Sequence, residues 1–177
     1  MQFAEKNFFQ LFSIPENFQI DQRLLAEHYR ELQDRFHPDR VAGAAGNERL
    51  KAVQLTSLVN EAYDTLKSPL KRAGYLLKLN GVDVEQVTQE DLGSDLLMEQ
   101  MLLRESLQDI GEDDAALDRL KALGEQVSAR LAKRQESFSR CLDSGRLQDA
   151  KRWFHEMQFL HKLASEIEET EERLLDY

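Results

Sequence analysis

Apolar residues in the first part of the chain recur at helical spacing. Residues 5–13 form a short predicted helix, which Pro15 cannot continue because proline lacks the backbone donor. Residues 21–36 follow with apolar positions at intervals of four, three and four, which predicts a helix with one buried stripe. The members of this stripe are Leu25, Tyr29, Leu32 and Phe36. Asp21 is a favourable N-cap, and Pro38 ends the helix because the residue before a proline avoids the helical conformation.

Two further helices are predicted before residue 80. The first covers residues 48–66, with the expected apolar positions Leu50, Val53, Leu58, Ala62 and Leu66. The second covers residues 69–79, where Pro69 suits the first turn and Gly81 suits the end. We therefore expect residues 1–80 to form one helical domain.

The second half of the chain predicts longer helices. Residues 81–93 show no helical period and are interpreted as a linker. Three helices are expected to follow, over 95–110, 114–142 and 146–176, separated by Gly111 and by a turn at 143–145. Long helices joined by short turns favour an antiparallel three-helix bundle over residues 94–177. The expected fold class is therefore all-α, with a small N-terminal helical domain before the bundle.

Charge separates the same two halves. Residues 1–80 carry a net charge of +1, whereas residues 81–177 carry −11. An acidic surface repels phosphate, so we expect no nucleic-acid partner. An equally open interpretation is that the acids only solvate the surface.

The sequence also argues against disulfides, cysteine-only metal sites, membrane helices and a signal peptide. One Cys allows neither an internal disulfide nor a metal site made of cysteines alone, and we expect no metal and no cofactor. No apolar run reaches the roughly 20 residues of a membrane helix, so no membrane partner is expected. The first residues lack the basic and apolar regions of a signal peptide, and a cytoplasmic location is therefore expected.

The tripeptide His37-Pro38-Asp39 stands directly after the striped helix. It is followed by a loop, by Asn60-Glu61-Ala62-Tyr63-Asp64-Thr65-Leu66, by Pro69 and by Arg72-Ala73-Gly74-Tyr75-Leu76-Leu77. This combination resembles a J-domain, the module with which co-chaperones stimulate ATP hydrolysis in chaperones of the heat-shock-70 class. The resemblance implies that His37, Pro38 and Asp39 contact the chaperone, together with Arg30 and Arg40. No P-loop pattern occurs, so ATP is expected to bind to the partner and the chain is not expected to be an enzyme.

The predicted helix over 95–110 carries more apolar residues than one buried stripe needs. At 100° per residue, Leu96, Leu107 and Ile110 fall within about 40° of Leu103 and form a core stripe. Leu97, Met98, Met101 and Leu102 fall on the opposite side, beside Glu105 and Asp109. Such a face either packs inside the protein or binds a partner, and periodicity alone leaves both open.

Nearly the whole chain resembles the HscB-type J-domain co-chaperones of iron–sulfur cluster biogenesis. The resemblance is carried by the J-domain motifs and by Leu97-Met98-Glu99-Gln100, Arg104-Glu105 and Leu174-Leu175-Asp176-Tyr177. It implies that the chain binds an IscU-type scaffold protein and delivers it to an HscA-type chaperone. The implied scaffold-binding residues are Leu97, Met98, Met101, Glu105, Asp109 and Phe159. Leu102 departs from the family pattern, which has an acid there, and a J-domain co-chaperone for another client is the alternative.

Overall fold

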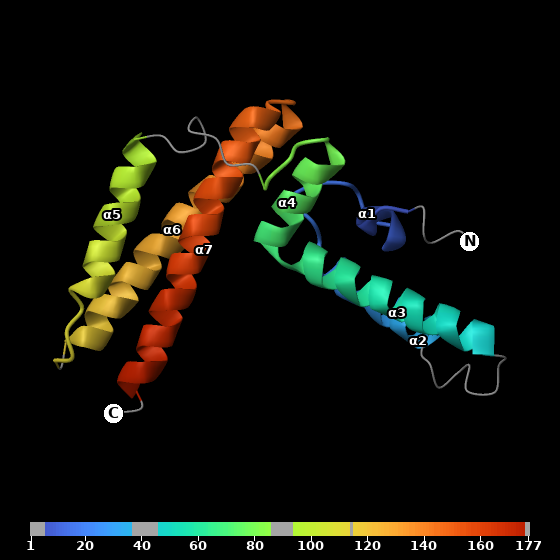
Figure 1. The fold of residues 1–177 in the computed structure, drawn as a ribbon, viewed down its shortest axis with the longest axis horizontal. Coiled ribbons are helices and arrows are strands. Elements are labelled where there is room, and N and C mark those ends of the chain that lie inside the picture. The colour runs from blue at the N-terminus through green and yellow to red at the C-terminus, as the bar shows by residue number, and fades with distance from the viewer. Residues whose placement is uncertain (1–5, 37–45, 86–93, 114, 176–177) are drawn as a thin grey trace. The chain divides into compact units, whose positions relative to one another are not determined.

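The computed structural model describes residues 6–36, 46–85, 94–113 and 115–175, and over these ranges its regular structure is entirely helical (Figure 1). The described helices are α1 (Phe8–Leu11), α2 (Gln22–Phe36), α3 (Gly46–Lys67), α4 (Pro69–Leu79), α5 (Ser94–Gln108), α6 (Ala116–Asp143) and α7 (Leu147–Leu175). The all-α prediction is confirmed. The chain forms two compact units, which divide between Leu76 and Leu77 near the end of α4.

Side-chain caps set the beginnings of the first two helices. Asn7 Oδ1 accepts a hydrogen bond of 2.9 Å from the backbone of Gln10, and Gln10 Oε1 accepts one of 3.1 Å from the backbone of Asn7. This capping box starts α1 later than residue 5, and the positive φ of 53° at Ser13 follows its end. Asp21 Oδ1 accepts hydrogen bonds from the backbones of Arg23 and Leu24, as predicted.

Helices α2 and α3 pair through their aromatic and apolar positions. The rings of Tyr29 and Tyr63 stack with centroids 3.9 Å apart, and Leu25 is fully buried. Near the other end of the pair, Thr56 Oγ1 donates a hydrogen bond of 3.1 Å to the carbonyl of Phe36, the last residue of α2. Leu50 and Val53, two of the apolar positions expected in α3, are exposed, whereas Ala52 between them is buried.

Arg72 on α4 holds the segment between α1 and α2 in place. Its Nε donates a hydrogen bond of 2.7 Å to the carbonyl of Phe18, and its Nη1 donates to the carbonyl of Leu66. Burial lowers the pKa of this guanidinium to about 10. The hydroxyl of Tyr75, one turn later, accepts a hydrogen bond of 3.0 Å from the backbone of Phe8. Two polar side chains of α4 thus connect the first unit's N-terminal segment to its other helices.

The second unit is built on a long hairpin of α6 and α7. Gly145, with φ of +70°, stands in the turn between them, where a side chain would be strained. One core cluster of this unit contains one buried residue of α5, three of α6 and three of α7: Leu103, Leu120, Leu123, Val127, Leu160, Leu163 and Ile167. Helix α5 completes the three-helix bundle by adding its core stripe to this hairpin. Of the helices the structure describes, none combines the length and the low polarity needed to cross a membrane.

Candidate protein-binding surface

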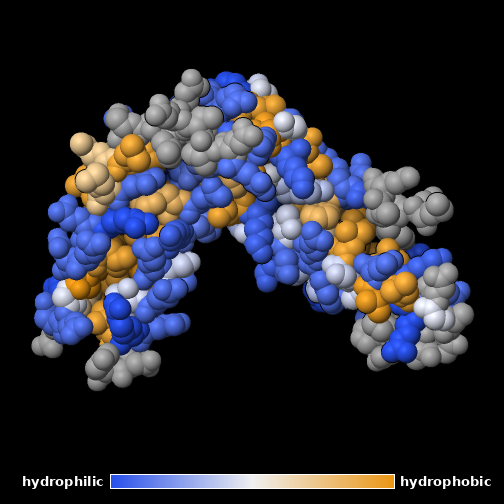
Figure 2. Space-filling model, viewed as in Figure 1, coloured by the Kyte–Doolittle hydropathy of each residue, from blue (hydrophilic) through white to orange (hydrophobic). Residues whose placement is uncertain are grey.

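Helix α5 buries one side and exposes the other. Leu96 and Leu103 are buried, with 7% and 4% of their surface exposed. The opposite side, called here the α5 outer face, consists of Leu97, Met98, Met101 and Leu102. These side chains are 46%, 66%, 72% and 58% exposed, respectively. Figure 2 shows this hydrophobic surface along α5. Among the described residues of the second unit no helix covers this face, so it is not used for packing there.

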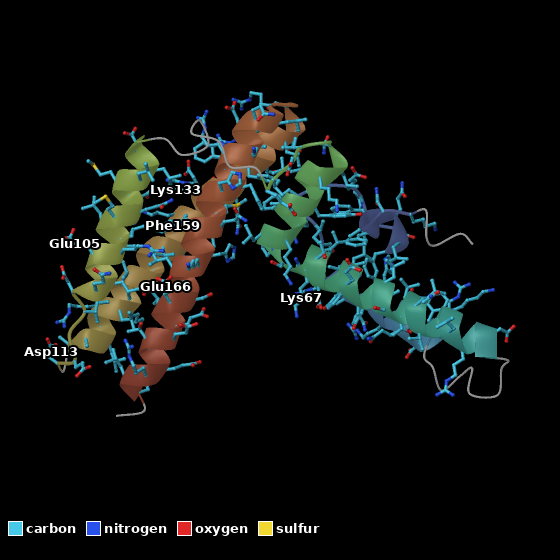
Figure 3. All side chains as sticks on the ribbon, in the orientation of Figure 1. Lys67, Glu105, Asp113, Lys133, Phe159 and Glu166 are labelled. Carbon is cyan, nitrogen blue, oxygen red and sulfur yellow. The ribbon has the colours of Figure 1, made fainter. Side chains whose placement is uncertain are left out.

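Acidic residues stand next to the apolar ones. Glu105 and Asp109 are both exposed at the C-terminal end of α5 and just beyond it. Glu105 lies on the side of α5 that points away from α6 and α7 (Figure 3). The structure therefore places five of the six predicted scaffold-binding residues, all those of this segment, on exposed positions.

Phe159 of α7 has a different environment from the α5 outer face. It is half-buried and packs against the core cluster of the bundle. The guanidinium of Arg104 on α5 lies 5.9 Å from the centroid of its ring, and Arg104 also approaches Glu166 at 4.0 Å. Phe159 therefore has a packing role within the bundle in addition to any role in binding. In the sequence, Arg104 belongs to the Arg104-Glu105 motif, and helical periodicity does not predict its contact with the ring of Phe159.

A charged network holds α5 against the other two helices. Glu99 on α5 accepts a hydrogen bond of 2.7 Å from Arg130 and another of 2.7 Å from Arg134, both on α6. Arg134 also donates a bond of 2.6 Å to Glu156 on α7, and its guanidinium lies 5.6 Å from the centroid of the Trp153 ring. Burial raises the pKa of Glu156, and the charge of Arg134 opposes this rise. The network lies directly behind the α5 outer face.

A hollow of about 510 Å³ lies where α5 meets α6. It is lined by two residues of the α5 outer face, Met98 and Leu102, and by the ion pair of Glu99 and Arg130. Its other described lining residues are Asp95, Leu103, Ser106 and Gln126. Leu102 thus extends the α5 outer face toward α6.

One of the five predicted chaperone contacts, Arg30, falls within the described residues. His37, Pro38, Asp39 and Arg40 lie outside the described residues. Arg30 is exposed on α2, and its Nε donates a hydrogen bond of 3.1 Å to the carbonyl of Ala26 one turn earlier. Its charged group is therefore held along the helix surface and open to solvent.

The described residues offer no group of His, Cys, Asp and Glu side chains arranged to hold a metal ion. Cys141 is a buried free thiol near the end of α6. His155 and His161 each have a buried Nε2 without a hydrogen-bond partner.

Comparison with known proteins decides the family. Residues 92–168 match the family model described as the HSCB C-terminal oligomerisation domain. The chain is 38% identical over 172 residues to the co-chaperone protein HscB of Proteus mirabilis, covering 96% of this chain and 98% of that protein. This chain belongs to the HscB co-chaperone family. The resemblance to HscB-type J-domain co-chaperones of iron–sulfur cluster biogenesis is thereby confirmed.

Solved structures of HscB proteins share the fold over nearly the whole chain. Chaperone HscB from Vibrio cholerae has a TM-score of 0.86 at 37% identity, covering 96% of this chain and 99% of that one. Human co-chaperone protein HscB also has a TM-score of 0.86, at 27% identity, covering 94% and 82%. The matched HSCB C-terminal region contains the whole of α5 and α6 and most of α7, so it includes the α5 outer face.

Proposed function

We propose that this HscB-family chain is an adaptor that joins an IscU-type scaffold protein to an HscA-type chaperone. The second unit binds the scaffold through Leu97, Met98, Met101, Glu105, Asp109 and Phe159. The first unit contacts the chaperone through His37, Pro38 and Asp39, with Arg30 and Arg40 beside them, and stimulates its ATP hydrolysis. Hydrolysis then promotes transfer of the iron–sulfur cluster to acceptor proteins.

The observation that carries this proposal is the exposure of the α5 outer face. A helix needs one apolar stripe to join a bundle, and α5 already buries Leu96 and Leu103 for that purpose. The four further large apolar side chains are in contact with water, so they contribute little to the packing of the bundle itself. Methionine adapts its shape to a partner, and both Met98 and Met101 stand where the helix is most exposed.

The acids beside this face favour a partner with basic groups around an apolar centre. Exposed Glu105 and Asp109 would add charge complementarity at the edge of the contact. Such edge charges mainly raise the association rate and select the partner, whereas the apolar centre supplies most of the affinity. An iron–sulfur scaffold with an apolar patch surrounded by lysines or arginines fits this surface.

The proposal is tested by the steady-state ATPase rate of an HscA-type chaperone, measured with this protein, with a scaffold, and with both. We expect stimulation by this protein alone and a larger stimulation when the scaffold is added. His37→Gln should abolish both effects while circular dichroism stays unchanged. A variant with Leu97, Met98 and Met101 changed to Ala should keep the first effect and lose the second.

Leu50→Ala is the matched control, because Leu50 is as exposed as the α5 leucines but lies in the other unit. It should retain the scaffold-dependent stimulation. Full stimulation by the His37→Gln protein would refute the chaperone half of the proposal. Undiminished scaffold dependence in the triple variant would refute the scaffold half and favour another client.

A further inference from the structure

A basic pocket lies at the turn end of the α6–α7 hairpin. Its volume is about 360 Å³, and its lining residues come from the last turns of α6, from the connecting turn and from the first turns of α7. They are Ser137, Arg140, Cys141, Arg146, Asp149, Arg152 and Trp153. Three arginines and one tryptophan therefore line a single hollow, in a part of the chain whose net charge is −11.

The described lining of this pocket carries more positive than negative charge, and the charge of Arg152 also acts on Glu156, which is not among these lining residues. Arg146 and Arg152 share the carboxylate of Asp149, at 3.6 Å and 4.0 Å, and both side chains are at least half exposed. Arg140 donates instead to the neutral hydroxyl of Ser137, at 3.2 Å. Among the described lining residues, three arginines thus face one carboxylate.

Three other arginines of the same unit have closer partners. Arg130 and Arg134 each donate to a carboxylate at 2.7 Å or less, and Arg119 holds Asp113 at 2.9 Å. Carboxylates are abundant in this half of the chain, yet the pocket contains only Asp149 within its described lining. Arginine is the side chain best suited to bind carboxylate oxygens in pairs, because its donors form a planar fork.

We propose that this pocket binds a carboxylate-rich peptide segment of a partner protein. The side chains of Arg146 and Arg152 are 59% and 50% exposed, and such open donors suit several carboxylates spaced along a peptide chain. A single small anion binds best where donors converge in an enclosed site, whereas these arginine side chains are at least half exposed. The indole of Trp153 offers an apolar wall for a side chain between the acids. This site goes beyond the scaffold and chaperone contacts proposed above and uses none of their residues.

Trp153 provides a direct reporter, because it is the single tryptophan of the chain. We would titrate the full-length protein with an unlabelled hexaglutamate peptide at low ionic strength and follow tryptophan emission. Binding of the same peptide carrying a fluorophore would be followed in parallel by anisotropy. We expect saturable binding with a change in tryptophan emission, and weakening by added salt because the contacts are exposed.

The decisive comparison uses two double variants with the same change of charge. Arg140→Gln with Arg152→Gln should weaken peptide binding by about tenfold or more. Arg119→Gln with Arg173→Gln removes two exposed arginines outside the pocket and should leave binding within about twofold. Absence of saturable binding, or equal weakening by both variants, would overturn the proposal. Tighter binding of tripolyphosphate than of the peptide, with the same dependence on Arg140 and Arg152, would also overturn it and assign the pocket to small polyanions.

Discussion

Arg134 on α6 donates a hydrogen bond of 2.7 Å to Glu99 on α5. The same guanidinium donates to Glu156 on α7, so one side chain connects all three helices of the second unit. Glu99 directly follows Met98 in α5, and its bonds to Arg130 and Arg134 fix how α5 rotates about its axis. We infer that this pair keeps the α5 outer face turned toward the solvent while Leu103 remains in the core.

Replacement of Arg134 by Gln should therefore destabilise the second unit. It leaves Glu156 mostly buried without its cation, and an unpaired group of this kind costs about 2–3 kcal/mol in the free energy of unfolding. Urea unfolding followed by circular dichroism measures the loss. Arg119→Gln is the control, because its pair with Asp113 is exposed and should contribute nothing measurable. Equal stability of the two variants would show that the network does not hold α5.

Much of this architecture could be predicted from the sequence. Periodicity located the helices to within a few residues, and Asp21 caps α2 as expected from its position. The Arg134 network could not be predicted, because ion pairs between helices distant in sequence leave no periodic pattern. The exposure of Leu50 also escaped prediction. An apolar position is buried only where a neighbour covers it, and the repeat of apolar residues does not show that Ala52 is covered while Leu50 is not.

The candidate site was predicted in part. The angular separation of Leu97, Met98 and Met101 from the core stripe follows directly from the helical repeat, and their exposure agrees with it. The contacts of Phe159 with the core cluster and with Arg104 could not be predicted, because they depend on how α5 packs against α7. The roles of these residues in binding remain predictions.

Arg72 should be essential to the first unit and difficult to replace by Lys. Its guanidinium donates to two backbone carbonyls, of Phe18 and Leu66, and a lysine ammonium cannot reproduce this fork. Arg72→Gln and Arg72→Lys should each lower the free energy of unfolding by about 2–4 kcal/mol, measured by urea unfolding. Arg23→Gln, an exposed change on α2, should alter it by less than about 0.5 kcal/mol. A fully stable Arg72→Lys protein would contradict the proposed role of the fork.

Leu102 should contribute to scaffold affinity through its apolar surface. It is 58% exposed and lines the hollow beside α6, so a partner that covers the α5 outer face would bury it. Leu102→Ala should weaken scaffold binding by about tenfold, which corresponds to roughly 1.4 kcal/mol, and leave the melting temperature unchanged. Calorimetry at low and high salt would show the same loss, because the contact is apolar. A loss that disappears at high salt would instead indicate an electrostatic contribution.

His161 should make the second unit less stable in acid. Desolvation lowers the pKa of this imidazole below 6.5, and its Nε2 has no hydrogen-bond partner. An imidazole whose pKa is lower in the folded protein than in the unfolded chain stabilises the fold at pH values above 6.5. This contribution is lost as the pH falls through 6.5 and then through the pKa of the folded state. The difference in unfolding free energy between the wild type and His161→Leu should therefore fall as the pH is lowered from 7.5 to 5. A difference independent of pH would show that His161 is not desolvated in solution.

The central claim is that the α5 outer face binds an iron–sulfur scaffold. Isothermal titration of an IscU-type scaffold into the full-length protein tests it most directly, with the variant Leu97→Ala, Met98→Ala, Met101→Ala and with Leu50→Ala as the matched control. We expect the wild type and the control to bind alike and the triple variant to lose at least about 100-fold in affinity, while its thermal unfolding stays unchanged. Equal affinity of the triple variant and the wild type would contradict the claim.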